Sequence, residues 1–111
     1  MEKALCDIKY ESGILSVSID GEIDHHTAKP LREKIDAAIY LYRAPKVVIR
    51  MPNVGFMDSA GLGLILGRYA KVSELGGELT VADPEPGAEK ILRLAGADKL
   101  IRIEKSGEVL K

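Results

Sequence analysis

An acid and a hydroxyl stand together near the middle of the chain, and glycines follow them. The stretch FMDSAGLG, residues 56–63, places Asp58 and Ser59 directly before a helical pattern. The free N–H groups and the dipole of a helix N-terminus favour negative charge, so a phosphate on Ser59 would be tolerated there. That phosphate would add about −1.5 to −2 charges beside Asp58. The residues therefore indicate a modifiable serine that could change what binds to this loop.

A structural role explains the same residues more plainly. Either Asp58 or Ser59 can cap the helix that follows. Gly61, Gly63 and Gly67 fall inside this helix, and each costs about 1 kcal/mol relative to alanine in a helix interior. The glycines indicate either that a partner approaches this helix closely, or that the helix packs tightly against the sheet or another helix. The sequence leaves both explanations open.

Known catalytic and nucleotide-binding motifs do not fit this stretch. A P-loop needs Lys and Ser or Thr after its second glycine, whereas Arg68 and Tyr69 follow Gly67. A dinucleotide fingerprint would need its third glycine one residue earlier. A hydrolase elbow would need glycine where Met57 stands, and no histidine follows Ser59 in the chain. We expect no catalytic residue here, with a small hydrolase or nucleotide-binding protein as the remaining alternative of that class.

A second polar loop carries an acid and two histidines. Asp24, His25 and His26 lie in the stretch GEIDHHTA, between a strand pattern and a helical pattern. Proline is tolerated only in the first turn of a helix, so Pro30 places the helix start near Thr27. Asp24 then stays in the loop, either as a local turn residue or as part of a site. Adjacent histidines face different ways, so no metal site is expected.

Alternating strand and helix patterns surround these two loops. Helices are expected from near Thr27 to Tyr42, from Ala60 to Leu75, and around residues 91–95. The expected strands are 4–10, 14–20, 47–51, 79–82 and 101–103, with the first two in a hairpin and 47–51 covered on both faces.

This order of elements predicts one α/β domain over residues 1–111. The domain would have a mixed, mostly parallel sheet of four to five strands, an N-terminal hairpin and three or more helices. The polar loops 21–27 and 52–59 would both lie at the carboxyl edge of the parallel strands, where binding sites form. Asp24 and Ser59 are therefore expected to be neighbours.

Composition excludes several classes of function. The 16 basic and 17 acidic residues give a net charge of −1, which argues against a nucleic-acid-binding surface. No apolar run reaches about 18 residues, so no membrane span is expected. The charged N-terminus does not read as a signal peptide. Cys6 is the single cysteine and cannot form an internal disulfide, so a reducing cytoplasm is the expected location.

Two stretches, GEIDHHTA and FMDSAGLGLILGRY, closely resemble the STAS-domain anti-sigma factor antagonists, most of all the sporulation type that acts on anti-sigma F factors. The resemblance spans essentially the whole chain. It implies that the anti-sigma factor, acting as a serine kinase with ATP, phosphorylates Ser59, so the chain itself needs no cofactor. It also implies that Asp24 supports phosphorylation and partner binding.

The resemblance further implies a switch between partners that regulates transcription. The unphosphorylated chain would bind the anti-sigma factor and release the sigma factor, the phosphorylated chain would not, and a serine phosphatase would restore binding. Family members often carry Ser or Thr where this chain has Ala60, so Ser59 is the only hydroxyl of the motif. A STAS regulator of a stress-response pathway, with the same switch but other partners, stays an alternative.

The residues and the resemblance agree on one surface for the partner. Phe56 and Met57 are expected to be buried anchors of its loop. Arg68 is expected to be exposed, either paired with an acid of the partner or solvated. The predicted partner-binding residues are Asp24, His25, His26, Asp58, Ser59, Gly61, Gly63 and Arg68.

Overall fold

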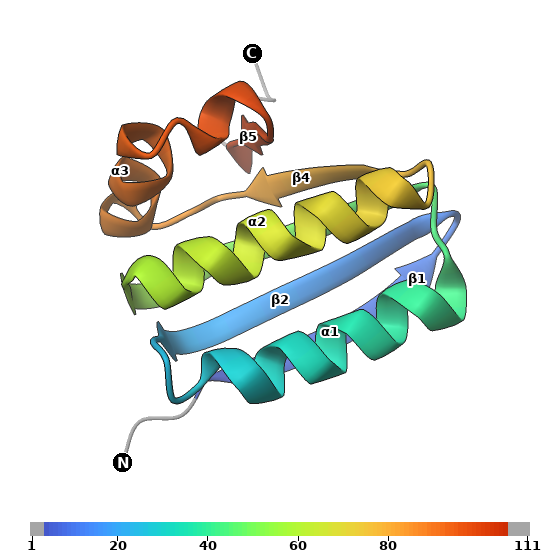
Figure 1. Cartoon of the computed structure of the whole chain (residues 1–111), viewed down its shortest axis with the longest axis horizontal. Coiled ribbons are helices and arrows are strands. Elements are labelled where there is room, and N and C mark those ends of the chain that lie inside the picture. The colour runs from blue at the N-terminus through green and yellow to red at the C-terminus, as the bar shows by residue number, and fades with distance from the viewer. Residues whose placement is uncertain (1–3, 107–111) are drawn as a thin grey trace.

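The computed structural model describes residues 4–106 as a five-stranded sheet with three α-helices (Figure 1). The ends of the predicted 1–111 domain, residues 1–3 and 107–111, lie outside the described residues. The elements in chain order are β1 (Leu5–Glu11), β2 (Ile14–Ile23), α1 (Ala28–Tyr42), β3 (Lys46–Met57), α2 (Ser59–Glu74), β4 (Glu78–Ala82), α3 (Pro86–Leu94), the 3₁₀ helix η1 (Ala97–Lys99) and β5 (Arg102–Glu104).

The sheet has the strand order β1-β2-β3-β4-β5. β1 and β2 are antiparallel, whereas every later pair is parallel. A helix connects each pair of parallel neighbours, which is the right-handed crossover arrangement expected of α/β folds. The predicted mixed sheet, its N-terminal hairpin and its three helices are therefore confirmed.

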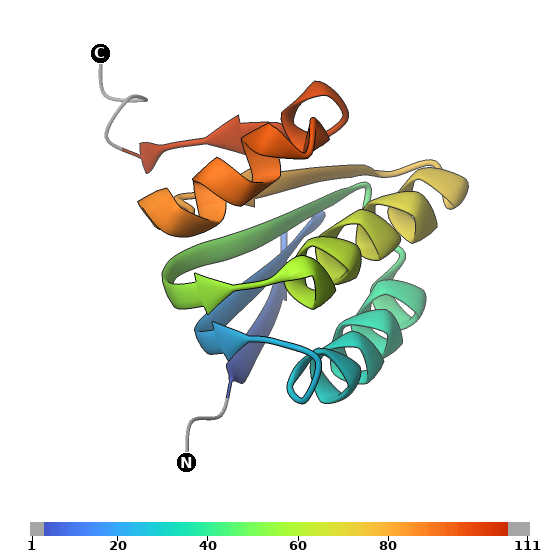
Figure 2. The same cartoon turned by 60° about the vertical axis from the view of Figure 1, so that its left-hand side comes forward.

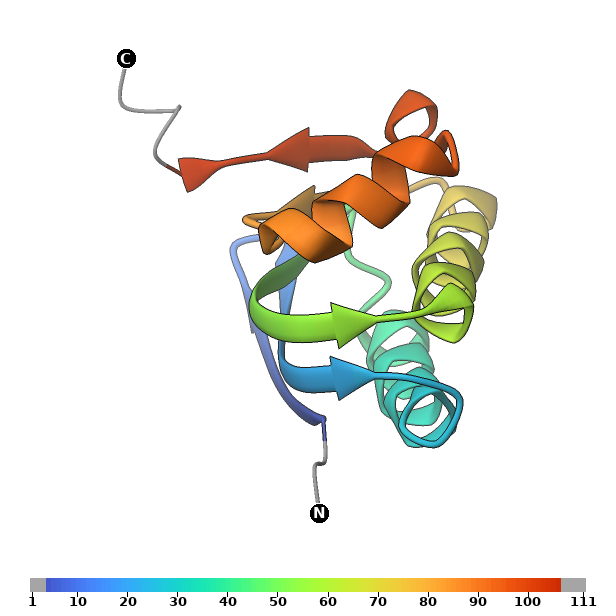
Figure 3. The same ribbon diagram turned by 90° about the vertical axis from the view of Figure 1, so that its left-hand side faces the viewer.

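One face of the sheet is covered by α1 and α2, which lie side by side (Figures 1 and 3). Alternate residues of β3 point toward these helices, and Val47, Ile49 and Met51 are buried. Val48 and Arg50 point to the opposite face and are only half-buried. The expectation that this strand is covered on both faces was wrong, because the single valine at position 48 makes an alternating strand look continuously apolar.

Both strands that lead to the polar loops run farther than the sequence predicted. β2 continues to Ile23 and β3 continues to Met57, and these two residues pair with each other. Register shifts on either side of Asp20 let the strands stay paired beyond Pro52, since a bulge accommodates a residue that cannot donate to the ladder. Figure 2 shows the resulting bend of β3. Most of the predicted loop 52–59 is therefore strand, and the predicted loop 21–27 begins with three strand residues.

The remaining elements close the other edge of the sheet. α3 lies against β3, and the Glu85 N–H that precedes its first turn donates to the Met51 carbonyl at 3.3 Å. β5 pairs with β4, one residue later than predicted. Within residues 4–106, no helix has the length and apolar character needed to cross a membrane.

Candidate functional site

The two strand-to-helix junctions meet at one edge of the sheet. Ile23 and Met57 end their strands as a pair, and the Asp58 N–H donates to the Ile23 carbonyl at 3.3 Å. Asp24 begins one junction and Asp58 forms the other, so the two polar segments lie side by side, as Figure 3 shows. The predicted proximity of the two loops is confirmed, although both are shorter than expected.

Asp58, and not Ser59, is the N-cap of α2. The Asp58 Oδ1 accepts hydrogen bonds from the N–H groups of Ala60 at 2.8 Å and Gly61 at 3.3 Å. Ser59 is the first residue of the helix and is exposed. Its hydroxyl makes no hydrogen bond within residues 4–106. The question of which residue caps the helix is settled in favour of Asp58, and the serine oxygen is available to solvent or a partner.

Asp24 is tied into its own turn. Its Oδ1 accepts hydrogen bonds from the N–H groups of His26 at 2.8 Å and Thr27 at 3.1 Å. These two bonds, that from Thr27 first, lower the pKa of the Asp24 carboxyl, because they stabilise its charged form. Thr27 stands at the N-cap of α1 as predicted, but its side chain makes no capping bond and instead donates to the Glu22 carbonyl at 2.9 Å.

The two histidines lie against each other on the turn that Asp24 begins. Their rings are 3.9 Å apart and tilted by 39°, and both are exposed. His26 Nδ1 lies 3.8 Å from Asp24 Oδ1. Among residues 4–106 there is no cluster of three or more His, Cys, Asp or Glu side chains that could hold a metal ion. The histidines are therefore surface groups on the turn that precedes α1.

The glycines of α2 have different reasons to be there. Gly61 is buried, and a Cβ at this position would lie 2.2 Å from Met57 Cγ and 3.2 Å from Ile23 Cγ2. The helix thus packs on the paired ends of β2 and β3, and the prediction that Gly61 opens a path for a partner was wrong. A Cβ at Gly63 or Gly67 would meet nothing within 4 Å. Gly63 is exposed and keeps the outer surface of α2 flat.

The two residues that end β3, Phe56 and Met57, differ in burial. Met57 is 2% exposed, as predicted, whereas Phe56 is 50% exposed. Consecutive strand residues point to opposite faces. Because both residues belong to β3 and not to a loop, their side chains point to opposite faces, and only Met57 is covered. The prediction for Phe56 was wrong.

The prediction that Arg68 is exposed was wrong. The residue is 4% exposed, and its Nε lies 2.8 Å from Asp36 Oδ1 on α1. Burial lowers the pKa of Arg68, and the Asp36 carboxylate opposes that shift. A sequence signal for this burial existed, because Arg68 falls four residues after Leu64 and four before Val72, inside the apolar stripe of α2.

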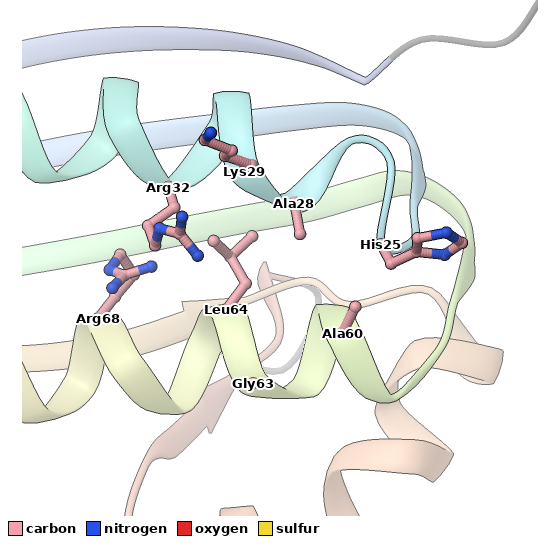
Figure 4. Close-up of a pocket in the computed structure, with 8 residues that line it drawn as sticks. All are labelled: His25, Ala28, Lys29, Arg32, Ala60, Gly63, Leu64 and Arg68. Atoms are coloured by element: carbon pink, nitrogen blue, oxygen red, sulfur yellow. The ribbon is translucent and has the colours of Figure 1, made fainter.

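A pocket of about 470 Å³ opens between α1 and α2, from the start of each helix as far as Arg32 and Arg68 (Figure 4). Sequence reasoning missed its α1 side, although Lys29, Arg32 and Asp36 recur at the spacing that places residues on one helix face. The pocket is lined by His25, Ala28, Lys29, Arg32, Ala60, Gly63, Leu64 and Arg68.

Comparisons with known proteins place this architecture in a family. The model of the STAS domain matches residues 6–108. The anti-sigma F factor antagonist of Paenibacillus polymyxa is 38% identical over 87% of this chain and 83% of its own length. The anti-sigma-B factor antagonist of Bacillus subtilis is 29% identical over 92% of each chain.

Solved structures show the same fold. The anti-sigma factor antagonist SpoIIAA in its unphosphorylated form has a TM-score of 0.79 and 24% identity, covering 96% of this chain and 93% of that one. SpoIIAA of Bacillus in the phosphorylated form has a TM-score of 0.73 and 24% identity, covering 96% of both chains. The paired junctions at Asp24 and Asp58 are thus part of a known architecture, and the chain belongs to the STAS domain family, among its anti-sigma factor antagonists.

Proposed function

We propose that this anti-sigma factor antagonist is switched by phosphorylation of Ser59. The observation that carries the proposal is the exposed Ser59 hydroxyl, which makes no hydrogen bond within residues 4–106 and stands at the first position of α2. Because Asp58 already caps the helix, the serine can change without removing the cap. The existence of SpoIIAA in an unphosphorylated and a phosphorylated form supports a switch of this kind.

The phosphate would come from ATP held by the anti-sigma factor, acting as a serine kinase. The Ser59 oxygen attacks the γ-phosphorus, a new O–P bond forms, ADP leaves, and a base of the kinase takes the hydroxyl proton. This chain supplies the acceptor and its positioning, and it is neither an enzyme nor the holder of a cofactor. ATP is supplied in the cytoplasm, which is where we place the exchange.

The charge of the phosphate explains how binding would be switched. It adds about −1.5 to −2 charges beside the Asp58 carboxylate, and the dipole of α2 stabilises that charge so that the fold survives. A partner matched to the neutral serine would then meet a doubly charged group. The unphosphorylated chain binds the anti-sigma factor and frees the sigma factor, and a serine phosphatase reverses the modification.

The partner surface consists of exposed groups around the two junctions. Asp24 orders its turn, His25 and His26 project from it, and Gly63 leaves the adjoining face of α2 open. Identity to the anti-sigma F factor antagonist is higher than to the anti-sigma-B factor antagonist, 38% against 29%. This difference supports a sporulation partner over a stress-response partner.

A direct test mixes the chain with the anti-sigma F factor of the same organism and ATP. We expect the intact mass to rise by one phosphate, fragment spectra to place it on Ser59, and the Ser59→Ala variant to stay unmodified. The modified chain should no longer be retained by the immobilised anti-sigma factor. A wild-type chain that gains no phosphate, or a Ser59→Ala chain that still gains one, would contradict the proposal.

A further inference from the structure

The groove between α1 and α2 carries more positive charge than its own carboxylate balances. Lys29 and Arg32 line it from α1, and Arg68 lines it from α2. Asp36 pairs with Arg68, whereas neither Lys29 nor Arg32 forms an ion pair within residues 4–106. Both of these cations are exposed. The groove therefore presents two positive charges to solvent.

Arg68 at the base of the groove is incompletely satisfied. Its side chain is 5% exposed, and its Nη1 is buried with no hydrogen-bond partner among residues 4–106. The Nε is within ion-pair distance of Asp36 Oδ1, but those two atoms do not meet hydrogen-bond geometry. A buried donor left unpaired carries a free-energy cost. An anion in the groove would offset that cost.

Like charges also face each other across the groove. Figure 4 shows the Arg32 and Arg68 side chains extending toward one another from α1 and α2. Burial is the main cause of the lowered pKa of Arg68, and repulsion from Arg32 acts in the same direction. The repulsion favours a negative group between the two guanidinium ions, and planar guanidinium groups match the two oxygens of a carboxylate.

The groove reaches the start of α2, next to the proposed phosphorylation site. Ala60 and Gly63 line it, and no Cβ at position 63 narrows it. Ser59 is four residues before Gly63, so the two are neighbours on the helix surface. A partner that places Ser59 in a kinase active site would therefore cover the mouth of this groove.

We infer that the groove receives an aspartate or glutamate side chain of the anti-sigma factor, held by Arg32 and Lys29 above the Arg68 charge. This inference rests on the proposed function, because it concerns the same partner. It also adds a reason for the switch. A phosphate on Ser59 would stand at the mouth of the groove, where it repels the incoming carboxylate and competes for the same cations.

The first test reverses the charge of the groove. The Lys29→Glu/Arg32→Glu variant should bind the nucleotide-loaded anti-sigma factor at least about tenfold more weakly than the wild type, because like charges then meet at the interface. The Lys99→Glu variant makes the same kind of change on an exposed lysine of η1 and should stay within about twofold of the wild-type affinity. Circular dichroism melting confirms that each variant is folded. A folded double variant with wild-type affinity would overturn the inference.

The second test identifies the anion. A carbodiimide joins an amine to a carboxylate in direct contact, so it should link Lys29 to an Asp or Glu of the anti-sigma factor. The Lys29→Arg variant keeps the positive charge but has no amine, so the link should be absent from it. If no such link forms, or if charge reversal weakens binding only when nucleotide is present, the anion is not a protein carboxylate and the inference is overturned. A wild-type chain that neither binds nor is phosphorylated would instead refute the proposed function.

Discussion

The two strand-to-helix junctions use their carboxylates and hydroxyls differently. At the β2–α1 junction, four residues intervene, and the Asp24 carboxylate accepts hydrogen bonds from the N–H groups of His26 and Thr27 within the turn. At the β3–α2 junction, Asp58 alone intervenes and caps the helix directly. The threonine hydroxyl of the first junction is bonded, whereas the serine hydroxyl of the second makes no bond within residues 4–106. One junction is built to hold its shape, and the other leaves a reactive group exposed.

Removing each hydroxyl gives the largest expected contrast between the junctions. Ser59→Ala should abolish phosphate transfer completely while changing the free energy of unfolding by less than about 0.5 kcal/mol, because the hydroxyl bonds nothing in the fold. Thr27→Ala should still be phosphorylated but should lose about 1 kcal/mol, because its hydroxyl bonds the Glu22 carbonyl. Kinase assays and urea unfolding of both variants check the contrast. Equal loss of stability in the two would break it.

Packing beneath the β3–α2 junction gives the next largest effect. Gly61→Ala should destabilise the fold by about 1–3 kcal/mol, because the added methyl overlaps the Met57 side chain. Gly63→Ala is the matched control. Its methyl meets nothing, so higher helix propensity should stabilise the fold by up to about 1 kcal/mol. Thermal unfolding distinguishes the two, and a stabilised Gly61→Ala variant would show that the junction is looser than its contacts indicate.

The capping hydrogen bonds of the β3–α2 junction should contribute less to the free energy of unfolding than the packing of Gly61. Asp58→Ala should cost about 1 kcal/mol, because the N–H groups of Ala60 and Gly61 lose their acceptor. Asp58→Asn is the matched control, since its amide oxygen can still accept and it retains most of the stability. Urea unfolding at neutral pH checks both variants. An Asp58→Ala variant that unfolds at the wild-type midpoint would show that the Asp58 cap does not stabilise the fold.

The contrast between the junctions explains which parts of the sequence analysis succeeded. The strand and helix order was predictable because alternation and helical spacing are local signals. Pro52 and Gly55 predict a loop, because no local signal indicates that bulges keep β3 paired with β2 up to Met57. The burial of Arg68 depends on Asp36, which lies 32 residues earlier and meets it only through the packing of α1 on α2. Contacts between elements had to come from the structure.

Protonation of Asp24 at acid pH should produce the smallest of these effects. The hydrogen bonds from Thr27 and His26 lower the pKa of Asp24 below its ordinary value, so the folded state favours the carboxylate. The resulting stability is present above the unfolded pKa, about 3.9, and is lost as the pH falls through the lower folded value. Asp24→Asn keeps an oxygen acceptor without the charge. The wild type should therefore exceed this variant in urea midpoint at pH 6, and the gap should narrow as the pH falls below about 3.9. A gap that does not change across this range would mean that the charge of Asp24 does not order the turn.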